Sequence, residues 1–205
     1  VLAGETTGRA LITVDEHAEN SIVVVPGANA NMRARTTPTA RVVIAQLEVP
    51  VDEVISAFRH AREAGARTVL NPAPAQTLPD ELVRLCDIVV PNEHEADLIG
   101  GVSALLALGV SAVVTTLGAA GVVVTESVDG VVGSWSEPAV EVMPVDTTGA
   151  GDAFCGALAA RLAAGDELRD AVRYAAAAGA LATTVAGAVP SLPHSAAVLA
   201  ITHPR

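Results

Sequence analysis

The stretch Val145-Asp146-Thr147-Thr148-Gly149-Ala150-Gly151-Asp152-Ala153-Phe154 determines the fold class that we expect for this chain. Residues 140–145, which lead into it, are rich in valine and predict the end of a strand. An alanine-rich segment begins at Asp152, and its larger apolar residues recur at the spacing of one helix face: Phe154, Leu158 and Leu162. The two glycines are therefore predicted to lie at a strand-to-helix turn.

A turn of this kind favours the binding of an anion. The first backbone N–H groups of a helix have no partner within the helix, and glycine lets an anion such as phosphate approach them closely. Asp152, at the start of the predicted helix, has two interpretations. It caps the helix, or it acts as a base beside a bound phosphate.

Two widespread phosphate-binding motifs do not fit this turn. A P-loop needs a lysine after its last glycine, but Asp152 stands there, and the chain contains no lysine at all. A dinucleotide-binding fingerprint needs a third glycine at the position that Phe154 occupies. Neither motif therefore explains the glycines.

Composition limits the class of protein. The 205 residues are enough for one domain, and 51% are hydrophobic but only 2% aromatic, so the core must consist of Val, Ala, Leu and Ile. The net charge of −11 argues against nucleic acid or an anionic membrane as a partner. We find neither a bilayer-spanning apolar run nor a signal peptide. Cys86 and Cys155 lie in apolar contexts and are expected as buried, reduced thiols of a cytoplasmic protein, although a disulfide between them stays open.

From residue 41 onward, strand-like and helix-like segments alternate, which predicts a mostly parallel sheet with helices on both faces. The expected strands are residues 41–47, 67–71, 87–90 and 110–115. The expected helices are residues 51–64, 79–86, 168–186 and 195–201. Residues 121–125 and 131–135 predict an antiparallel pair that turns at Asp129-Gly130.

A second hairpin is expected near the beginning of the chain. Residues 10–14 and 21–25 are β-rich, and a polar segment separates them. From the residues alone, this hairpin is as well explained as an edge of the main sheet as by any functional role.

The segment from Asp146 to Phe154 resembles the C-terminal signature of the ribokinase-like carbohydrate kinases. The resemblance implies a three-layer α/β/α sandwich with a mostly parallel sheet and a small β lid. Residues 1–30 would form part of that lid and its connection, and residues 31–205 would form the kinase core. It also implies an anion hole at Gly149, Ala150 and Gly151, with Asp152 as the base that deprotonates a sugar hydroxyl.

The reaction that the resemblance implies is ATP-dependent phosphorylation of a sugar. The leading substrate is D-ribose, which would yield ribose 5-phosphate, and three weaker matches favour it: Gly27-Ala28-Asn29-Ala30, Gln46-Leu47-Glu48 and Asn71-Pro72-Ala73-Pro74-Ala75.

The resemblance assigns further residues to ATP and Mg²⁺. Asn92 and Glu95 predict an N-cap pair on their own, and the resemblance adds nucleotide binding by Asn92 and Mg²⁺ binding near Glu95. Mg²⁺ prefers oxygen ligands and keeps several waters, so one carboxylate acting through water suffices. The other nucleotide-binding residues implied are Thr116, Gly118 and Gly121, in a turn that is otherwise an ordinary connection between strands. Because Ala120 replaces a residue that is often basic in the family, we expect weaker phosphate contact there.

Glu48 follows a predicted strand, and open α/β sheets bind ligands at the carboxyl ends of their strands. The resemblance makes Glu48 a sugar ligand, while a surface carboxylate is the equally weighted alternative.

The resemblance also implies a K⁺ ion that is held mostly by carbonyl groups, with Asp146 supplying the charge. A turn-forming aspartate is the rival interpretation of Asp146. The residues implied around the ion are Asp146, Thr148, Ala182, Val185, Gly187 and Ser191.

Two departures from the family pattern stand out. The first strands of the family, with an Asp and a Gly-Gly segment that grip the sugar, have no counterpart in this sequence. We therefore expect a chain that lacks the N-terminal part, binds Mg·ATP and phosphorylates ribose poorly alone. The connection at residues 100–108 is also shorter than is usual in the family.

The resemblance further implies a homodimer formed through the lid. The rivals to a ribose kinase are a sister kinase for fructose, a sugar phosphate or a nucleoside, and a non-catalytic nucleotide-binding remnant.

Overall fold

The computed structural model describes residues 5–14, 20–34 and 39–202. Two compact units divide the chain, and each is described by itself. The first unit is built on Val24–Leu117 and Val122–Ser136. The second is built on Glu137–Arg205 together with Gly118–Gly121 and Ala10–Val23.

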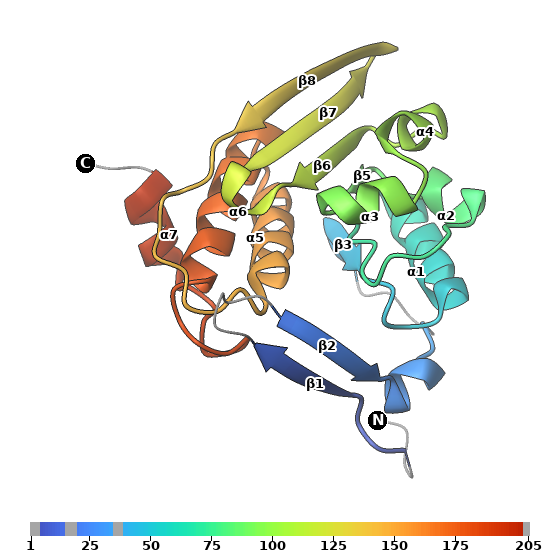
Figure 1. Ribbon diagram of the computed structural model, residues 1–205. Helices are drawn as coiled ribbons and strands as arrows, with labels where there is room; N and C mark the ends of the chain where they lie inside the picture. Colours follow the sequence, from blue (N-terminus) through green and yellow to red (C-terminus); the bar gives the residue numbers. More distant parts are fainter. Residues whose placement is uncertain (1–4, 15–19, 35–38, 203–205) are drawn as a thin grey trace. The chain divides into compact units, whose positions relative to one another are not determined.

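The first unit contains a six-stranded sheet with the order β3-β4-β5-β6-β7-β8 (Figure 1). Neighbouring strands from β3 to β6 are parallel, whereas β7 runs antiparallel to β6. Between β7 and β8, Asp129 and Gly130 have φ values of 50° and 79°, the left-handed pair that a tight hairpin turn requires. The mostly parallel sheet and the hairpin are as the sequence predicts. The strands are β3 (Val42–Ala45), β4 (Arg67–Leu70), β5 (Ile88–Val89), β6 (Ala112–Thr116), β7 (Val122–Val128) and β8 (Val131–Glu137).

The core of the first unit forms where helix α1 (Val51–Glu63) packs on β3 and β4. The predicted face of α1 is the buried one: Val54, Ile55 and Phe58 are 1%, 8% and 0% exposed. Burial of each such side chain contributes roughly 1.5–3 kcal/mol. The other helices of this unit are α2 (Asp80–Arg84), α3 (Glu93–Leu98) and α4 (Val102–Ala107), and a 3-10 turn η1 covers Gly27–Asn31.

Two details of the first unit differ from expectation. The apolar run at residues 41–47 predicts a buried strand, but β3 is the terminal strand in the order and its Ile44 is 38% exposed. The connection between α3 and β6, expected as a short link, contains helix α4, whose N-cap Gly101 adopts φ 84°. Periodicity did not reveal this helix because it is only 6 residues long.

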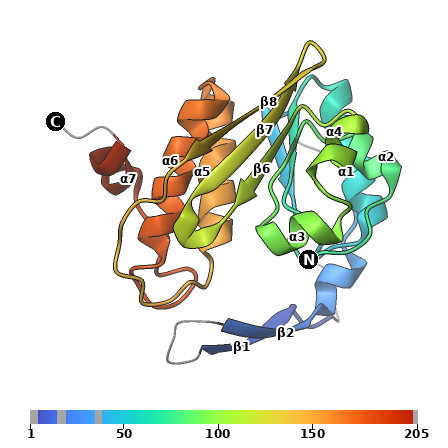
Figure 2. The same cartoon turned by 45° about the horizontal axis from the view of Figure 1, so that its top comes forward.

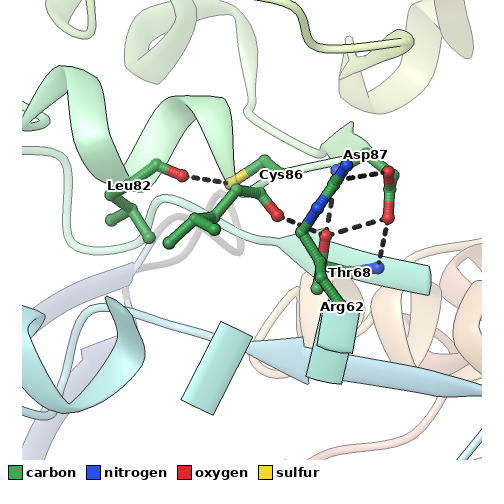
Figure 3. A network of polar contacts seen from close by, with 6 residues as sticks. Arg62, Thr68, Leu82, Cys86 and Asp87 are labelled. Atoms are coloured by element: carbon green, nitrogen blue, oxygen red, sulfur yellow. Dashed lines mark hydrogen bonds and ion pairs between the residues drawn. The ribbon is translucent and has the colours of Figure 1, made fainter. Parts of the chain in front are cut away.

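A polar network ties the amino ends of β4 and β5 together (Figure 3). The carboxylate of Asp87 accepts hydrogen bonds from the backbone N–H of Thr68 at 2.8 Å and from the Arg62 guanidinium at 2.7 Å. Thr68 is fully buried, and its hydroxyl donates to the carbonyl of Leu85 at 2.6 Å. Next to it, burial raises the pKa of the Cys86 thiol to about 12, so this cysteine is an inert core residue.

The second unit is built on three helices, α5 (Ala150–Ala164), α6 (Leu168–Ala182) and α7 (Ser195–Thr202), with α5 beside α6 and α6 beside α7 (Figure 2). Phe154, Leu158 and Leu162 are buried on one face of α5, as predicted. Helices α5 and α6 approach closely at Gly179, where a Cβ would lie 3.2 Å from the carbonyl oxygen of Ala150. Cys155 is also buried, and neither cysteine is in a disulfide.

Residues 140–145 are not a strand, so this expectation was wrong. Pro144 has no N–H to contribute to a sheet. The N–H groups of Val145 and Asp146 instead donate to the carbonyl of Thr183, at 2.7 and 3.1 Å. Helix α6 correspondingly ends at Ala182, four residues before the predicted end at 186. The glycine turn thus connects an irregular segment, rather than a strand, to α5.

The N-terminal hairpin consists of β1 (Arg9–Val14) and β2 (Asn20–Val25), which form a separate two-stranded sheet. It is therefore not an edge of the six-stranded sheet. Most of the polar segment between these strands, residues 15–19, lies outside the described residues.

Candidate active site

The conformation of the glycine turn requires a glycine at position 149. This residue is the N-cap of α5 and adopts the left-handed conformation at φ 79°, which glycine tolerates best. A Cβ at this position would lie 3.3 Å from the Cα and Cβ of Ala188, so the turn also needs glycine for space. Gly149, as a glycine, has no side chain with which to cap the helix. Asp152 lies exposed in the first turn of α5.

The N–H groups at the start of α5 form the candidate anion-binding site. The N–H of Ala150 makes a turn hydrogen bond with the carbonyl of Thr147, at 3.2 Å. Gly151 follows, and a Cβ placed on it would have no protein atom within 4 Å. The space in front of Gly151 is therefore open, as the approach of an anion to the helix N-terminus requires.

Asp146 joins the glycine turn to the segment after α6. One carboxylate oxygen accepts the N–H of Thr148 at 2.9 Å, and the other accepts the N–H of Gly187 at 2.8 Å. The Thr148 side chain, and after it the backbone N–H groups of Gly187 and Thr148, lower the pKa of Asp146 below its ordinary value. Asp146 is only 9% exposed and therefore holds a nearly buried negative charge. The hydrogen bond from the N–H of Thr148 closes a turn at Asp146, as the interpretation of a turn-forming aspartate expects.

Thr148 carries an unusual buried oxygen. The residue is 8% exposed, and within residues 5–14, 20–34 and 39–202 its hydroxyl is the one buried side-chain N or O atom without a hydrogen-bond partner. A buried hydroxyl without a partner costs roughly 1–3 kcal/mol. A nearby cation would compensate this cost, since the hydroxyl oxygen has lone pairs to offer.

The remaining residues assigned to the cation lie in or after α6. Ser191 is buried, and its N–H donates to the carbonyl of Gly187 at 3.3 Å. Ala182, the last residue of α6, is fully buried, whereas the side chain of Val185 is 46% exposed. The structure thus links Asp146, Thr148, Gly187 and Ser191 by hydrogen bonds. Ala182 and Val185 have only their backbone carbonyls to offer to a cation.

In the first unit, Asn92 and Glu95 form the predicted capping box at the start of α3. The Asn92 side chain accepts the N–H of Glu95, and the Glu95 carboxylate accepts the N–H of Asn92, both at 2.8 Å. Burial raises the pKa of Glu95, while the hydrogen bond from Asn92 opposes this shift. Asn92 also forms a bridge with Thr116, whose N–H donates to the carbonyl of Pro91 at 2.9 Å. The carboxyl ends of β5 and β6 therefore place Asn92 beside Thr116.

The two glycines after β6 serve different purposes. Gly118 begins the 3-10 turn η2 (Gly118–Ala120) at φ 55°, and a Cβ there would meet nothing within 4 Å. Gly121 has φ 94°, and a Cβ there would collide with the backbone of Glu137 and lie 2.8 Å from the N atom of Ala139. The chain's own backbone therefore requires Gly121, and ligand approach is not needed to explain it.

Glu48 is exposed two residues after Gln46, beyond the end of β3. Leu47, between them, is buried and donates its N–H to the carbonyl of Ala73 at 2.8 Å.

Within the described ranges, no three His, Cys, Asp or Glu side chains gather as a metal site, so Glu95 is no part of a carboxylate cluster there. Asn71, which the sequence presents only as part of a weaker family match, is a buried amide that links Gln46, after β3, to Val90, after β5.

The fold is that of the ribokinase-like α/β proteins. Over 98% of its length, the chain matches a structure of Arabidopsis thaliana ribokinase complexed with ribose and ATP, with 28% identity and a TM-score of 0.83, and covers 71% of that chain. Residues 1–195 match the family described as pfkB family carbohydrate kinase. The chain therefore belongs to the pfkB family of carbohydrate kinases, as its resemblance implied.

Two curated relatives are similar over most of the chain. A bifunctional ribokinase/ribose-5-phosphate isomerase A of Fructilactobacillus sanfranciscensis is 40% identical over 95% of the chain. The ribokinase of Staphylococcus aureus is 39% identical over 91% of the chain. The chain spans 39% of the length of the first protein and 67% of the second. No helix among the described residues is long and apolar enough to cross a bilayer.

Proposed function

We propose that this protein transfers a phosphoryl group from ATP to a hydroxyl of D-ribose and forms ribose 5-phosphate and ADP. The observation that carries the proposal is the N-terminus of α5, where glycine is the N-cap residue, a Cβ on Gly151 would meet no protein atom within 4 Å, and Asp152 lies exposed in the first turn. This arrangement occurs in a chain 39% identical to the S. aureus ribokinase and similar to a ribokinase structure that holds ribose and ATP.

In the proposed reaction, the carboxylate of Asp152 removes the proton of the sugar hydroxyl. The resulting oxygen forms a bond to the γ-phosphorus of ATP, and the bond from this phosphorus to the bridging oxygen breaks, so that ADP leaves. The N–H groups of Gly149, Ala150 and Gly151 stabilise the negative charge on the transferring group. Phosphoryl transfer depends mostly on such positioning and electrostatic stabilisation.

Further residues are proposed to contact the sugar and the nucleotide. Glu48 is proposed to bind a sugar hydroxyl. Asn92, Thr116, Gly118 and Gly121 are proposed to contact the nucleotide. The bridge between Asn92 and Thr116 supports this assignment, because it brings two of these residues together at the carboxyl ends of parallel strands.

Mg²⁺ is proposed to bind near Glu95. The donor chemistry fits, since Glu95 offers carboxylate oxygens and Mg²⁺ keeps several of its waters. One of these oxygens already accepts the N–H of Asn92. Glu95 would therefore bind the ion through a water molecule. The bound ion would neutralise charge on the ATP phosphates.

K⁺ is proposed to bind beside the glycine turn. The unpartnered Thr148 hydroxyl and the nearly buried charge of Asp146 fit a monovalent cation. Ser191 and the backbone carbonyls of Ala182, Val185 and Gly187 would complete the site. The ion would order residues 187–191 next to the helix N-terminus without contacting the substrate.

Residues 1–30 are proposed to form part of a lid, and residues 31–205 the kinase core. The protein is proposed to be a cytoplasmic enzyme that forms a homodimer through this lid. The apolar side chains that the hairpin exposes support the proposed dimer. These side chains are Leu11, Ile12, Val23, Val24 and Val25, between 43% and 65% exposed.

Substitution of the proposed base tests this function. We expect Asp152→Asn to lower ribose-dependent turnover by roughly 10²–10⁴-fold, the usual value of a positioned base. Calorimetry should show little change in Mg·ATP binding. Asp170→Asn on the surface of α6 is the matched control and should turn over ribose like the wild type. Near-normal turnover by Asp152→Asn would refute the assignment, and a higher rate with fructose or a nucleoside than with ribose would refute the substrate.

A further inference from the structure

Asn71 is a buried amide at the carboxyl end of β4. It is 9% exposed, and its backbone N–H continues the sheet by donating to the carbonyl of Ala45 at 3.0 Å. Its side chain extends in two further directions. The amide nitrogen donates to the carbonyl of Val90 at 2.8 Å, and the amide oxygen accepts the side-chain N–H of Gln46 at 2.8 Å.

The orientation of this amide is fixed by its partners. The carbonyl of Val90 can only accept a hydrogen bond, so Asn71 must present its NH₂ group there. Its oxygen then faces Gln46, whose own NH₂ group donates to it. The two side chains therefore form a chain of hydrogen bonds from Gln46 through Asn71 to the carbonyl of Val90, which is called the relay below.

The relay joins segments that do not neighbour each other in the sheet. Strand β4 lies between β3 and β5, and the Asn71 side chain reaches from the segment after β3 to the end of β5. Glu48 follows Gln46 by two residues, and Asn92 follows Val90 by two residues. The relay thus connects the segment that carries the proposed sugar ligand to the one that carries the proposed nucleotide cap.

Both polar atoms of the Asn71 side chain are used inside the protein. We propose that Gln46 and Asn71 are positioning residues, which hold Glu48 in fixed register with the Asn92–Glu95 capping box so that sugar and nucleotide bind at matched positions. This inference rests on the proposed function, since it assigns the residues to that site. A displacement of about 1 Å in such groups can reduce catalysis strongly, because rate depends on alignment.

Thr68 provides a matched control on the same strand. It lies three residues before Asn71, roughly 10 Å away along the strand, at the amino end of β4. It is buried like Asn71, and its hydroxyl likewise joins β4 to the segment before β5 (Figure 3). Thr68→Val therefore removes comparable hydrogen bonds without affecting the ends that carry Glu48 and Asn92.

The test compares Asn71→Leu, Gln46→Met, the double variant and Thr68→Val. We expect Asn71→Leu to raise KM for both ribose and Mg·ATP by roughly three- to tenfold, the value of about one hydrogen bond. Gln46→Met should do the same to a smaller extent, and the double variant should equal Asn71→Leu alone, because the residues act as a unit. Thr68→Val should lower the thermal midpoint and leave both KM values unchanged. If Asn71→Leu does not fold, the half-buried Gln46 position still decides the outcome through the same two KM values.

Hydrogen exchange separates failure of the relay from failure of the proposed function. We expect Asn71→Leu to increase exchange at the N–H groups of Leu47 and Glu95, which are hydrogen-bonded in the wild type, and Thr68→Val to leave both unchanged. Absence of ribose-dependent turnover and of Mg·ATP binding in the wild type would overturn the proposed function. Unchanged exchange at both positions, or unchanged KM values with a lowered thermal midpoint, would overturn the positioning role.

Discussion

Gly151→Ala should make the protein more stable and less active. Gly151 is the second residue of α5, its φ is not positive, and a Cβ there would meet no protein atom within 4 Å. Nothing in the fold requires glycine at this position. The proposed anion site does, because a methyl group there would stand where the phosphoryl group approaches the N–H groups.

The size of both effects follows from the surroundings of Gly151. Alanine in place of glycine stabilises a helix interior by roughly 0.5–1 kcal/mol. For a chain of this size, that gain corresponds to a rise in the thermal midpoint of about 1–4 °C. We expect kcat/KM for the sugar to fall at least about tenfold, which equals roughly 1.4 kcal/mol of lost transition-state stabilisation.

Gly156→Ala is the matched control. Gly156 lies in the same helix and is exposed, and a Cβ at this position would likewise meet no atom within 4 Å. The variant should therefore gain similar stability and keep its activity. Unfolding can be followed by the fluorescence of the single tryptophan, Trp135, and activity by coupled ADP release. Equal activities of the two alanine variants would refute the claim that glycine at 151 serves an incoming anion.

Two further predictions concern the proposed cation site. Replacing Na⁺ by K⁺ at fixed ionic strength should raise the rate of sugar phosphorylation, and equal rates in the two salts would count against a K⁺ site. Because the pKa of Asp146 is lowered in the folded state, its contribution to stability is fully present above the ordinary carboxyl value of about 3.9 and is lost as pH falls through the folded pKa. Chemical denaturation between pH 2 and pH 6 should therefore show a smaller pH dependence for Asp146→Asn than for the wild type, and identical pH profiles would contradict this.

The sequence predicted those parts of the fold that depend on local pattern. The apolar faces of α1 and α5 follow directly from residues spaced three and four apart, and both faces are buried. The turn at Asp129-Gly130 and the capping box at Asn92 follow from short-range backbone chemistry. Family resemblance added the kinase fold and proposed roles for the loops, which periodicity does not provide.

The parts that escaped prediction depend on contacts between distant residues. Residues 140–145 have strand-like composition, but the N–H groups of Val145 and of the following Asp146 donate to the carbonyl of Thr183 at the end of α6, so tertiary contacts override propensity. The sequence predicts a ligand contact at Gly121. The structure shows instead that a Cβ there would collide with the backbone of Glu137 and Ala139, and no local sequence pattern predicts this long-range contact. Neither the burial of Asn71 nor the unpartnered hydroxyl of Thr148 leaves a local signal in the sequence.

The most direct test of the central claim is the stoichiometry of the reaction. Phosphorus NMR of the protein incubated with Mg·ATP and D-ribose in K⁺ buffer follows substrate and product together. We expect ribose 5-phosphate and ADP to form slowly and in equal amounts, no ADP to form when ribose is left out, and both products to form roughly 10²–10⁴-fold more slowly when Asp152 is replaced by Asn. ADP formation that does not depend on ribose, or a complete lack of phosphorylated sugar, would contradict the account.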